Sequence, residues 1–175
     1  MSKHDPIKGQ YIYLTVEGVE YRVYYEEAGE GIPLLVGHTA GSDGRQYRHL
    51  LCDTDVTDHF RCIAFDLPFH GKSLPPYGKK WWAEEYNITK SLMMAFPNTL
   101  AKELELDKPV YMGQSMGGHL AIDLASKFPD SYRATIAVEG ALRSAAEYVD
   151  VGMAGIRYEF DNPNVNRAST GAAMM

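Results

Sequence analysis

Apolar and polar residues alternate along residues 11–29, and this two-residue period is typical of β-strands with one buried face. Glu17 and Gly18 interrupt the alternation near its midpoint. A glycine at such a position permits the tight turn that joins two antiparallel strands. We therefore predict a β-hairpin over residues 11–29.

Further along, apolar runs without alternation are typical of strands buried on both faces, and they cover residues 32–37, 60–68, 109–113 and 132–140. Helical spacing of apolar residues predicts helices over 45–51, 81–106 and 118–128, with a kink or break in the second at Pro97. Strands that alternate with helices predict an α/β fold: a mostly parallel sheet covered by helices on both faces, preceded by the N-terminal hairpin.

Ligands of such sheets bind beyond the carboxyl ends of the strands. Three polar, glycine-rich segments follow predicted strands, namely "GHTAGSDG" (37–44), "DLPFHGKS" (66–73) and "GQSMGGH" (113–119). Their shared position predicts a functional site where the three segments converge.

Composition narrows the class of protein. The chain has 175 residues and a net charge of −6, which argues against a nucleic-acid partner. Cys52 and Cys62 are too few for a disulfide framework, and we expect reduced thiols. No secretory leader and no apolar run long enough to span a membrane is visible, so we expect a cytoplasmic protein that acts on a small molecule and has no membrane partner. Metal-ligand spacings such as H-x-x-x-H are absent, and no metal or other cofactor is expected.

Residues 113–117, "GQSMG", fit the pattern G-x-S-x-G between a predicted strand and a predicted helix. In that context the serine lies on a sharp turn that exposes its hydroxyl, and the flanking glycines make room for it. The first amides of the following helix suit a developing negative charge. We therefore interpret Ser115 as a nucleophile; a plain tight turn is the alternative.

The three segments resemble motifs of the α/β-hydrolase family and stand in that family's order: an oxyanion loop in "LLVGHTAGS", a loop after the fourth strand in "AFDLPFHGKS", and a nucleophile elbow from 110 onward. The resemblance covers about residues 20–142. It implies a Ser115 nucleophile and an oxyanion hole made by the amides of Ala40 and Met116. Thr39 and His70 stand where the family motifs have glycine.

Around the nucleophile, we expect His38, Thr39 and Gln114 to line the substrate site, with His38 mainly making structural hydrogen bonds. Glu139, at the end of the sixth strand, is a candidate for the acid that orients a catalytic histidine; the alternative is a strand-end residue without chemistry. The family places that histidine far downstream, but among the six histidines only His119 follows Ser115, within the helix of the elbow. We also expect the last two strands of the family's sheet to be missing from this chain.

Residues 1–142 are thus expected to form a hydrolase core, and 143–175 the start of a cap or linker. The expected function is that of a serine hydrolase acting on an ester or similar acyl substrate. Hydrolysis of a carbon–carbon bond, acyl transfer, and a non-catalytic binding domain or incomplete fragment are the alternatives. An unpaired sixth strand further predicts self-association or completion by a C-terminal fragment.

Overall fold

The computed structural model describes residues 5–83 and 88–141. The chain divides into two units, residues 1–140 and 141–175. The predicted cap or linker over 143–175 lies outside the described residues and stays a prediction.

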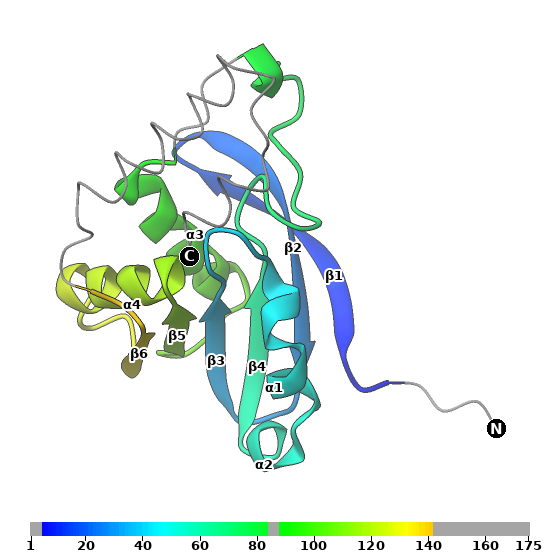
Figure 1. Ribbon diagram of the computed structural model, residues 1–175, viewed down its shortest axis with the longest axis vertical. Helices are drawn as coiled ribbons and strands as arrows, with labels where there is room; N and C mark the ends of the chain where they lie inside the picture. The colour runs from blue at the N-terminus through cyan, green and yellow to red at the C-terminus, as the bar shows by residue number, and fades with distance from the viewer. Residues whose placement is uncertain (1–4, 84–87, 142–175) are drawn as a thin grey trace, which may run out of the picture. The chain divides into compact units, whose positions relative to one another are not determined.

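One six-stranded sheet organises the first unit, in the order β1-β2-β4-β3-β5-β6 (Figure 1). The strands are β1 (Lys8–Val16), β2 (Val19–Ala28), β3 (Ile32–Gly37), β4 (Phe60–Phe65), β5 (Val110–Gln114) and β6 (Ala134–Val138). β1 and β2 form the predicted hairpin around Glu17 and Gly18, both of which have positive φ. β2 is antiparallel to β4, whereas β3 is parallel to both β4 and β5, and β5 is parallel to β6. The predicted α/β fold class is confirmed, with a sheet that is mixed because of the hairpin.

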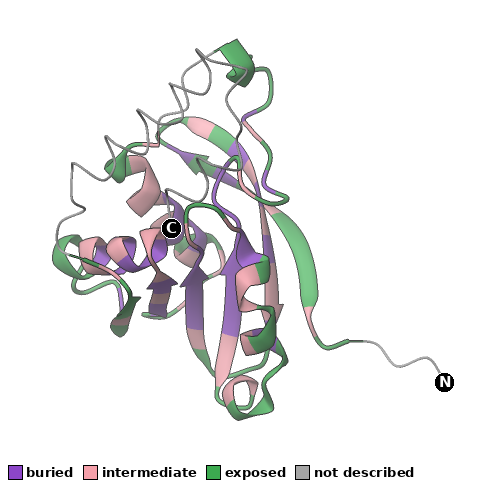
Figure 2. Cartoon of the chain, in the orientation of Figure 1, coloured by how far each residue is buried: buried purple, intermediate pink, exposed green. Residues whose placement is uncertain are grey.

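Helices cover both faces of the sheet, and β3 in its centre is mostly buried (Figure 2). Leu35 belongs to one buried cluster, which also contains residues of α3 (Lys90–Glu103) and α4 (Met116–Lys127). Leu34 and Val36 belong to a second cluster, which contains residues of α1 (Arg48–Cys52) and is lined by residues of α2 (Thr54–Thr57) and the 3₁₀ helix η1 (Gly44–Tyr47). The two faces of the sheet therefore each have a core.

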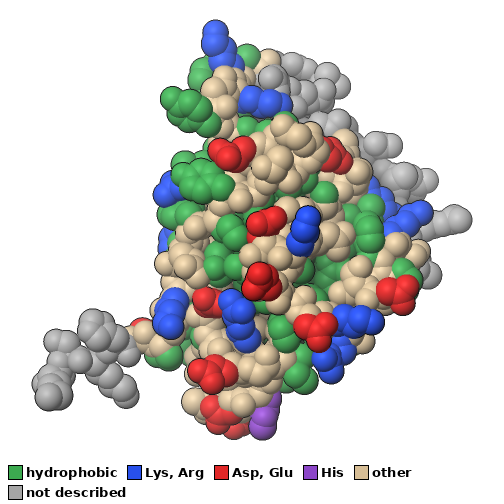
Figure 3. Space-filling view, turned by 180° about the vertical axis from the view of Figure 1, so that it is seen from behind, with side chains coloured by type: hydrophobic (Ala, Val, Ile, Leu, Met, Phe, Trp, Pro, Cys, Tyr) green, Lys and Arg blue, Asp and Glu red, His purple; other side chains and the backbone are tan. Residues whose placement is uncertain are grey.

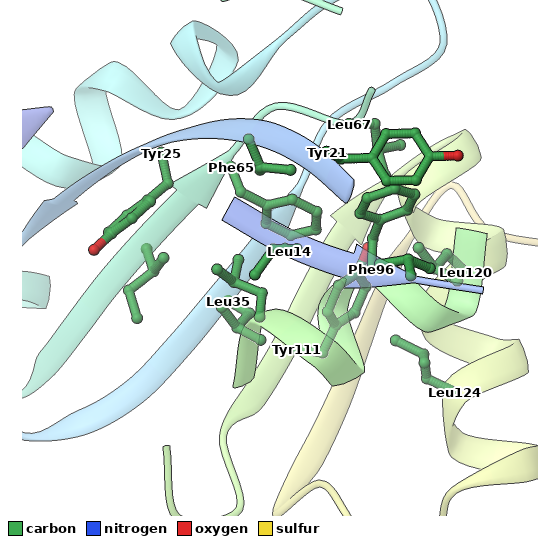
Figure 4. Close-up of a cluster of buried hydrophobic side chains, with 14 of the residues drawn as sticks. Leu14, Tyr21, Tyr25, Leu35, Phe65, Leu67, Phe96, Tyr111, Leu120 and Leu124 are labelled. Carbon is green, nitrogen blue, oxygen red and sulfur yellow. The ribbon is translucent and has the colours of Figure 1, made fainter. Parts of the chain in front are cut away.

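The larger cluster is aromatic as well as aliphatic (Figure 4). Tyr21 of β2 packs edge-on against Phe96 of α3, with ring centroids 4.9 Å apart. Edge-to-face contact is a favourable arrangement for two aromatic rings. This contact fixes α3 against the hairpin, on the same face as α4.

The predicted helix over 81–106 is wrong at its start. Residues Trp81–Ala83 form a short 3₁₀ helix, η2, and α3 begins only at Lys90, where the Thr89 hydroxyl accepts a hydrogen bond from the Leu92 amide. Pro97 also does not break the helix, which continues to Glu103. Phe96 and Leu100, both buried, anchor α3 on either side of the proline, so packing outweighs the one lost hydrogen bond.

Within the described residues, β6 pairs with β5 alone and forms an edge of the sheet. Its apolar side chains Ile136 and Val138 are 46% and 41% exposed.

On the face shown in Figure 3, acidic and basic side chains are interspersed, and there is no broad basic area. No helix of the described part combines the length and the apolar character needed to cross a membrane.

Candidate active site

Ser115 occupies the sharp turn between β5 and α4. Its backbone is left-handed, with φ 52° and ψ −112°, a region that L-residues rarely adopt. The Ser115 amide donates to the Val138 carbonyl at 2.9 Å, which ties this turn to the end of β6. Strain of this kind persists only where the surrounding structure enforces it, and it is concentrated at functional sites.

Gly113 and Gly117 allow this turn to close. A Cβ on Gly113 would lie 2.3 Å from the carbonyl carbon of Gly117. A Cβ on Gly117 would lie 2.2 Å from the carbonyl oxygen of Gly37, at the end of β3. Because both obstacles are backbone atoms, no side chain can turn away to make room. The glycines therefore bring the elbow against the loop that follows β3.

Two hydrogen bonds to the Thr39 carbonyl fix the loop after β3. The Thr39 carbonyl accepts from His38 Nδ1 at 2.8 Å and from the Ser42 amide at 3.2 Å. In a trans peptide the C=O and N–H point in opposite directions. Holding the Thr39 carbonyl therefore turns the Ala40 N–H the other way.

The Ala40 and Met116 amides donate no hydrogen bond to any described residue. Met116 is the first residue of α4, where the amides of a helix lack partners within the helix. Ala40 and Met116 are also the two residues for which the resemblance to the α/β-hydrolase family implies an oxyanion hole. Their free amides, one from each segment, can serve as donors to a developing negative charge.

His38 is fully buried and both of its ring nitrogens are engaged. Its Nε2 accepts the Leu67 amide hydrogen at 3.1 Å, so the proton must lie on Nδ1, which faces the Thr39 carbonyl. Burial lowers the pKa of His38 below its ordinary value, in agreement with a neutral ring. His38 is thus a structural link between two loops and is not placed to take a proton from Ser115.

His70 and Asp66 hold the loop after β4. The ring of His70 places Nδ1 3.0 Å from the Pro68 carbonyl oxygen and Nε2 3.2 Å from the Ala40 carbonyl oxygen. The buried Asp66 carboxylate accepts the Gly44 and Lys72 amides, each at 2.7 Å. These two bonds fix the loop after β4 and connect it to Gly44, not to the elbow.

Glu139 follows β6 with a positive φ of 53°. Its Oε2 accepts a hydrogen bond from Gln114 Nε2 at 2.7 Å. Gln114 Oε1 in turn accepts from Gln46 Nε2 at 2.5 Å, and Gln46 Oε1 accepts the Thr39 amide at 3.0 Å. Sequence reasoning missed Gln46, a polar residue of a 3₁₀ helix outside every recognised motif.

The structure thus brings together Thr39, Ala40, Gln114, Ser115, Met116 and Glu139 at the carboxyl ends of β3, β5 and β6. It does not bring a histidine to the Ser115 hydroxyl, which makes no hydrogen bond within residues 5–83 and 88–141. In that same part of the chain, no group of His, Cys, Asp and Glu side chains is arranged to hold a metal ion.

A serine on a strained strand-to-helix turn, at the carboxyl ends of parallel strands, is typical of the nucleophile-elbow class of α/β proteins. The family described as alpha/beta hydrolase fold matches residues 32–170, and the chain belongs to this family.

Curated relatives carry several activities. A 2-hydroxy-6-oxononadienedioate/2-hydroxy-6-oxononatrienedioate hydrolase of Burkholderia vietnamiensis is 26% identical over 154 residues, which are 85% of this chain and 50% of that protein. Haloalkane dehalogenase 2 of Mycobacterium bovis is 27% identical over 115 residues, 66% of this chain and 37% of that protein. This chain therefore spans about half the length, or less, of these relatives.

Among solved structures, a thermophilic esterase from Thermogutta terrifontis superposes with a TM-score of 0.71 at 24% identity. The match covers 89% of this chain and 55% of the esterase. The likeness concerns the fold, and it agrees with a chain that contains part of the full α/β-hydrolase architecture.

Proposed function

We propose that the chain provides the nucleophile and the oxyanion hole of a serine hydrolase acting on an ester or similar acyl substrate. The observation that supports this most directly is the strained turn at Ser115, together with the Ala40 and Met116 amides, which donate to no described residue. A hydroxyl and two amide donors from separate segments are two of the parts that acyl transfer requires, and a general base is the third.

In the proposed reaction, Ser115 Oγ attacks the carbonyl carbon and its proton passes to a general base. The carbonyl oxygen becomes an anion that the Ala40 and Met116 amides stabilise. Collapse of this intermediate breaks the bond to the alkoxy group, which leaves with the proton from the base. Water then attacks the acyl-enzyme in the same way, releasing the carboxylic acid and restoring the serine.

Three other side chains have roles in this proposal. Thr39 and Gln114, both partly exposed beside the elbow, contact the substrate. Glu139 provides the carboxylate that would orient a histidine base. The buried His38 acts only through the Thr39 carbonyl. No described histidine forms a hydrogen bond with the Ser115 hydroxyl, so the base in this proposal is a group that the described residues do not supply.

Two alternatives have specific support. The curated relative from Burkholderia favours hydrolysis of a carbon–carbon bond, in which the same nucleophile and oxyanion hole would act on a ketone carbon. The lack of a hydrogen bond to the Ser115 hydroxyl among the described residues favours a binding domain without catalysis.

Intact-mass spectrometry after treatment with a fluorophosphonate tests the proposal. We expect one adduct, mapped to Ser115, that is absent in Ser115→Ala and unchanged in the control Ser131→Ala, since Ser131 lies exposed in the turn after α4. Hydrolysis of a p-nitrophenyl ester by the same samples would then separate ester cleavage from the carbon–carbon alternative. A folded protein without an adduct would contradict an activated serine and leave the binding domain.

A further inference from the structure

Four hydrogen-bonding groups form a continuous chain across the carboxyl ends of three strands. The groups are the Thr39 amide, the side-chain amides of Gln46 and Gln114, and the Glu139 carboxylate, and we call them the amide relay. The three bonds measure 3.0, 2.5 and 2.7 Å in that order. The relay thus connects the loop after β3 with the elbow and with the end of β6.

Both ends of the relay impose the same direction on its amides. A backbone N–H can only donate, so Gln46 must turn its Oε1 toward Thr39 and its Nε2 toward Gln114. A carboxylate can only accept, so Gln114 must turn its Nε2 toward Glu139. Turning either side-chain amide over would bring two oxygens or two NH₂ groups together. The arrangement is therefore specified as a unit.

The relay acts on a backbone that is already held from its other side. The Thr39 carbonyl is bonded to His38 and Ser42, whereas the Thr39 N–H is bonded, among the described residues, only to Gln46. With both its N–H and its C=O held, Thr39 has little freedom to rotate. The direction of the next amide, that of Ala40, follows from it.

We propose that Gln46 is a positioning residue, which holds the oxyanion loop in register with the elbow and with Glu139. This effect of Gln46 on catalysis rests on the proposed function. The direction of the Ala40 amide changes the reaction rate only if that amide is part of an oxyanion hole. Gln46 itself touches no reacting atom in this proposal. Its role is to link β3 to β5 through side chains at the point where their ladder ends.

Two substitutions separate the two bonds of Gln46. Gln46→Met keeps the length of the side chain and removes both bonds. Gln46→Glu keeps an acceptor for the Thr39 amide but breaks the relay at Gln114, whichever way that amide turns. A matched control is Gln10→Met, since Gln10 on β1 also bridges two side chains, Tyr25 and Glu27, in the hairpin.

Nuclear magnetic resonance tests the relay without relying on catalysis. Glu139→Gln perturbs one end, and the Thr39 amide resonance of ¹⁵N-labelled protein reports at the other. We expect this substitution to shift the Thr39 resonance in the natural background and in Gln10→Met. In Gln46→Met the shift should be lost, because methionine can neither accept from the Thr39 amide nor donate to Gln114. A Thr39 shift that persists in Gln46→Met, or that is missing in the natural background, would overturn the relay.

Ester hydrolysis by the same variants tests the consequence for rate. Loss of one oxyanion donor lowers kcat by about 10²–10³-fold, so a misdirected donor should lower it by roughly tenfold, with little change in KM. The fall should be smaller in Gln46→Glu, which keeps the Thr39 bond. An active protein whose kcat is unaffected by Gln46→Met would refute the positioning role. If the unsubstituted protein neither hydrolyses the ester nor reacts at Ser115, the proposed function is refuted instead. The Thr39 resonance measurement still tests the relay in that case, because it does not depend on catalysis.

Discussion

Removing the hydroxyl of Tyr111 should stabilise the protein. Tyr111 lies on β5, in the centre of the sheet, and is fully buried (Figure 4). Its hydroxyl has no hydrogen-bond partner among the described residues. Burial also raises the pKa of Tyr111 well above its ordinary value, so the group remains neutral. Tyr111→Phe deletes an unsatisfied polar group and keeps the ring.

The size of the effect follows from two opposing contributions. A buried, unsatisfied polar group costs about 1–3 kcal/mol of desolvation. The hydroxyl oxygen also fills space close to Gly37, where a Cβ would lie 2.0 Å from it, and its removal leaves a small void. Subtracting the packing lost at that void leaves a net gain of about 1 kcal/mol. For a chain of this length, this gain raises Tm by roughly 2–4 °C.

Tyr132 provides a matched control for this substitution. It is also buried, and its ring centroid lies 6.2 Å from that of Tyr111, but its hydroxyl donates to Asn98 Oδ1 at 2.7 Å. Tyr132→Phe should therefore lower the free energy of unfolding by about 1 kcal/mol. Urea unfolding followed by circular dichroism gives both values. If the two substitutions have the same sign, the assignment of the Tyr111 hydroxyl as unsatisfied is refuted.

Three further predictions concern the elbow, the loop after β3 and the sheet edge. Gly113→Ala should lower the yield of folded protein or its Tm sharply, because the new Cβ would meet the Gly117 backbone at 2.3 Å; an unchanged melting curve would contradict this contact. Hydrogen bonds from Arg45 lower the pKa of Asp43 to about 2, so its contribution to stability is present above the unfolded carboxyl pKa of about 3.9 and is lost as the pH falls toward 2. Asp43→Asn should flatten the acid limb of a stability–pH profile, and an identical limb would count against the ion pair. Ile136→Lys on the exposed edge should shift sedimentation toward the monomer, and no shift would mean that β6 does not mediate association.

Local patterns were sufficient to predict much of the sheet and the elbow. The hairpin turn at Glu17 and Gly18 and the turn at Ser115 both depend on residues that are adjacent in sequence, and both are present. The predicted start of the helix at residue 81 was wrong, because α3 begins at Lys90. The predicted helix included Trp81 and Trp82, but they are 50% and 68% exposed and belong to the short η2. The side chain of Thr89, which caps α3, was the local signal that could have corrected this boundary.

The amide relay could not be predicted in the same way. Gln46 and Gln114 are distant in the sequence, and a glutamine in a short helix has no pattern that distinguishes it from a solvated one. The contact exists because η1 follows β3 closely and β3 pairs with β5, which places two partly buried amides face to face. Such contacts depend on which strands pair over a long sequence distance. The hydrophobic period of the sequence does not show this pairing.

The pairing of β3 with β5 also has a consequence for the order of folding. Gly37 and Gly113 are register partners at the end of this ladder, although the intervening chain forms β4 and α3. Closing so long a loop is slow compared with forming the hairpin, whose strands are adjacent. Until it closes, the Ala40 amide and the Ser115 hydroxyl belong to separate parts of the chain. A refolding chain should therefore acquire its far-ultraviolet circular dichroism before its reactivity toward a fluorophosphonate, and the site should form in the step that completes the centre of the sheet.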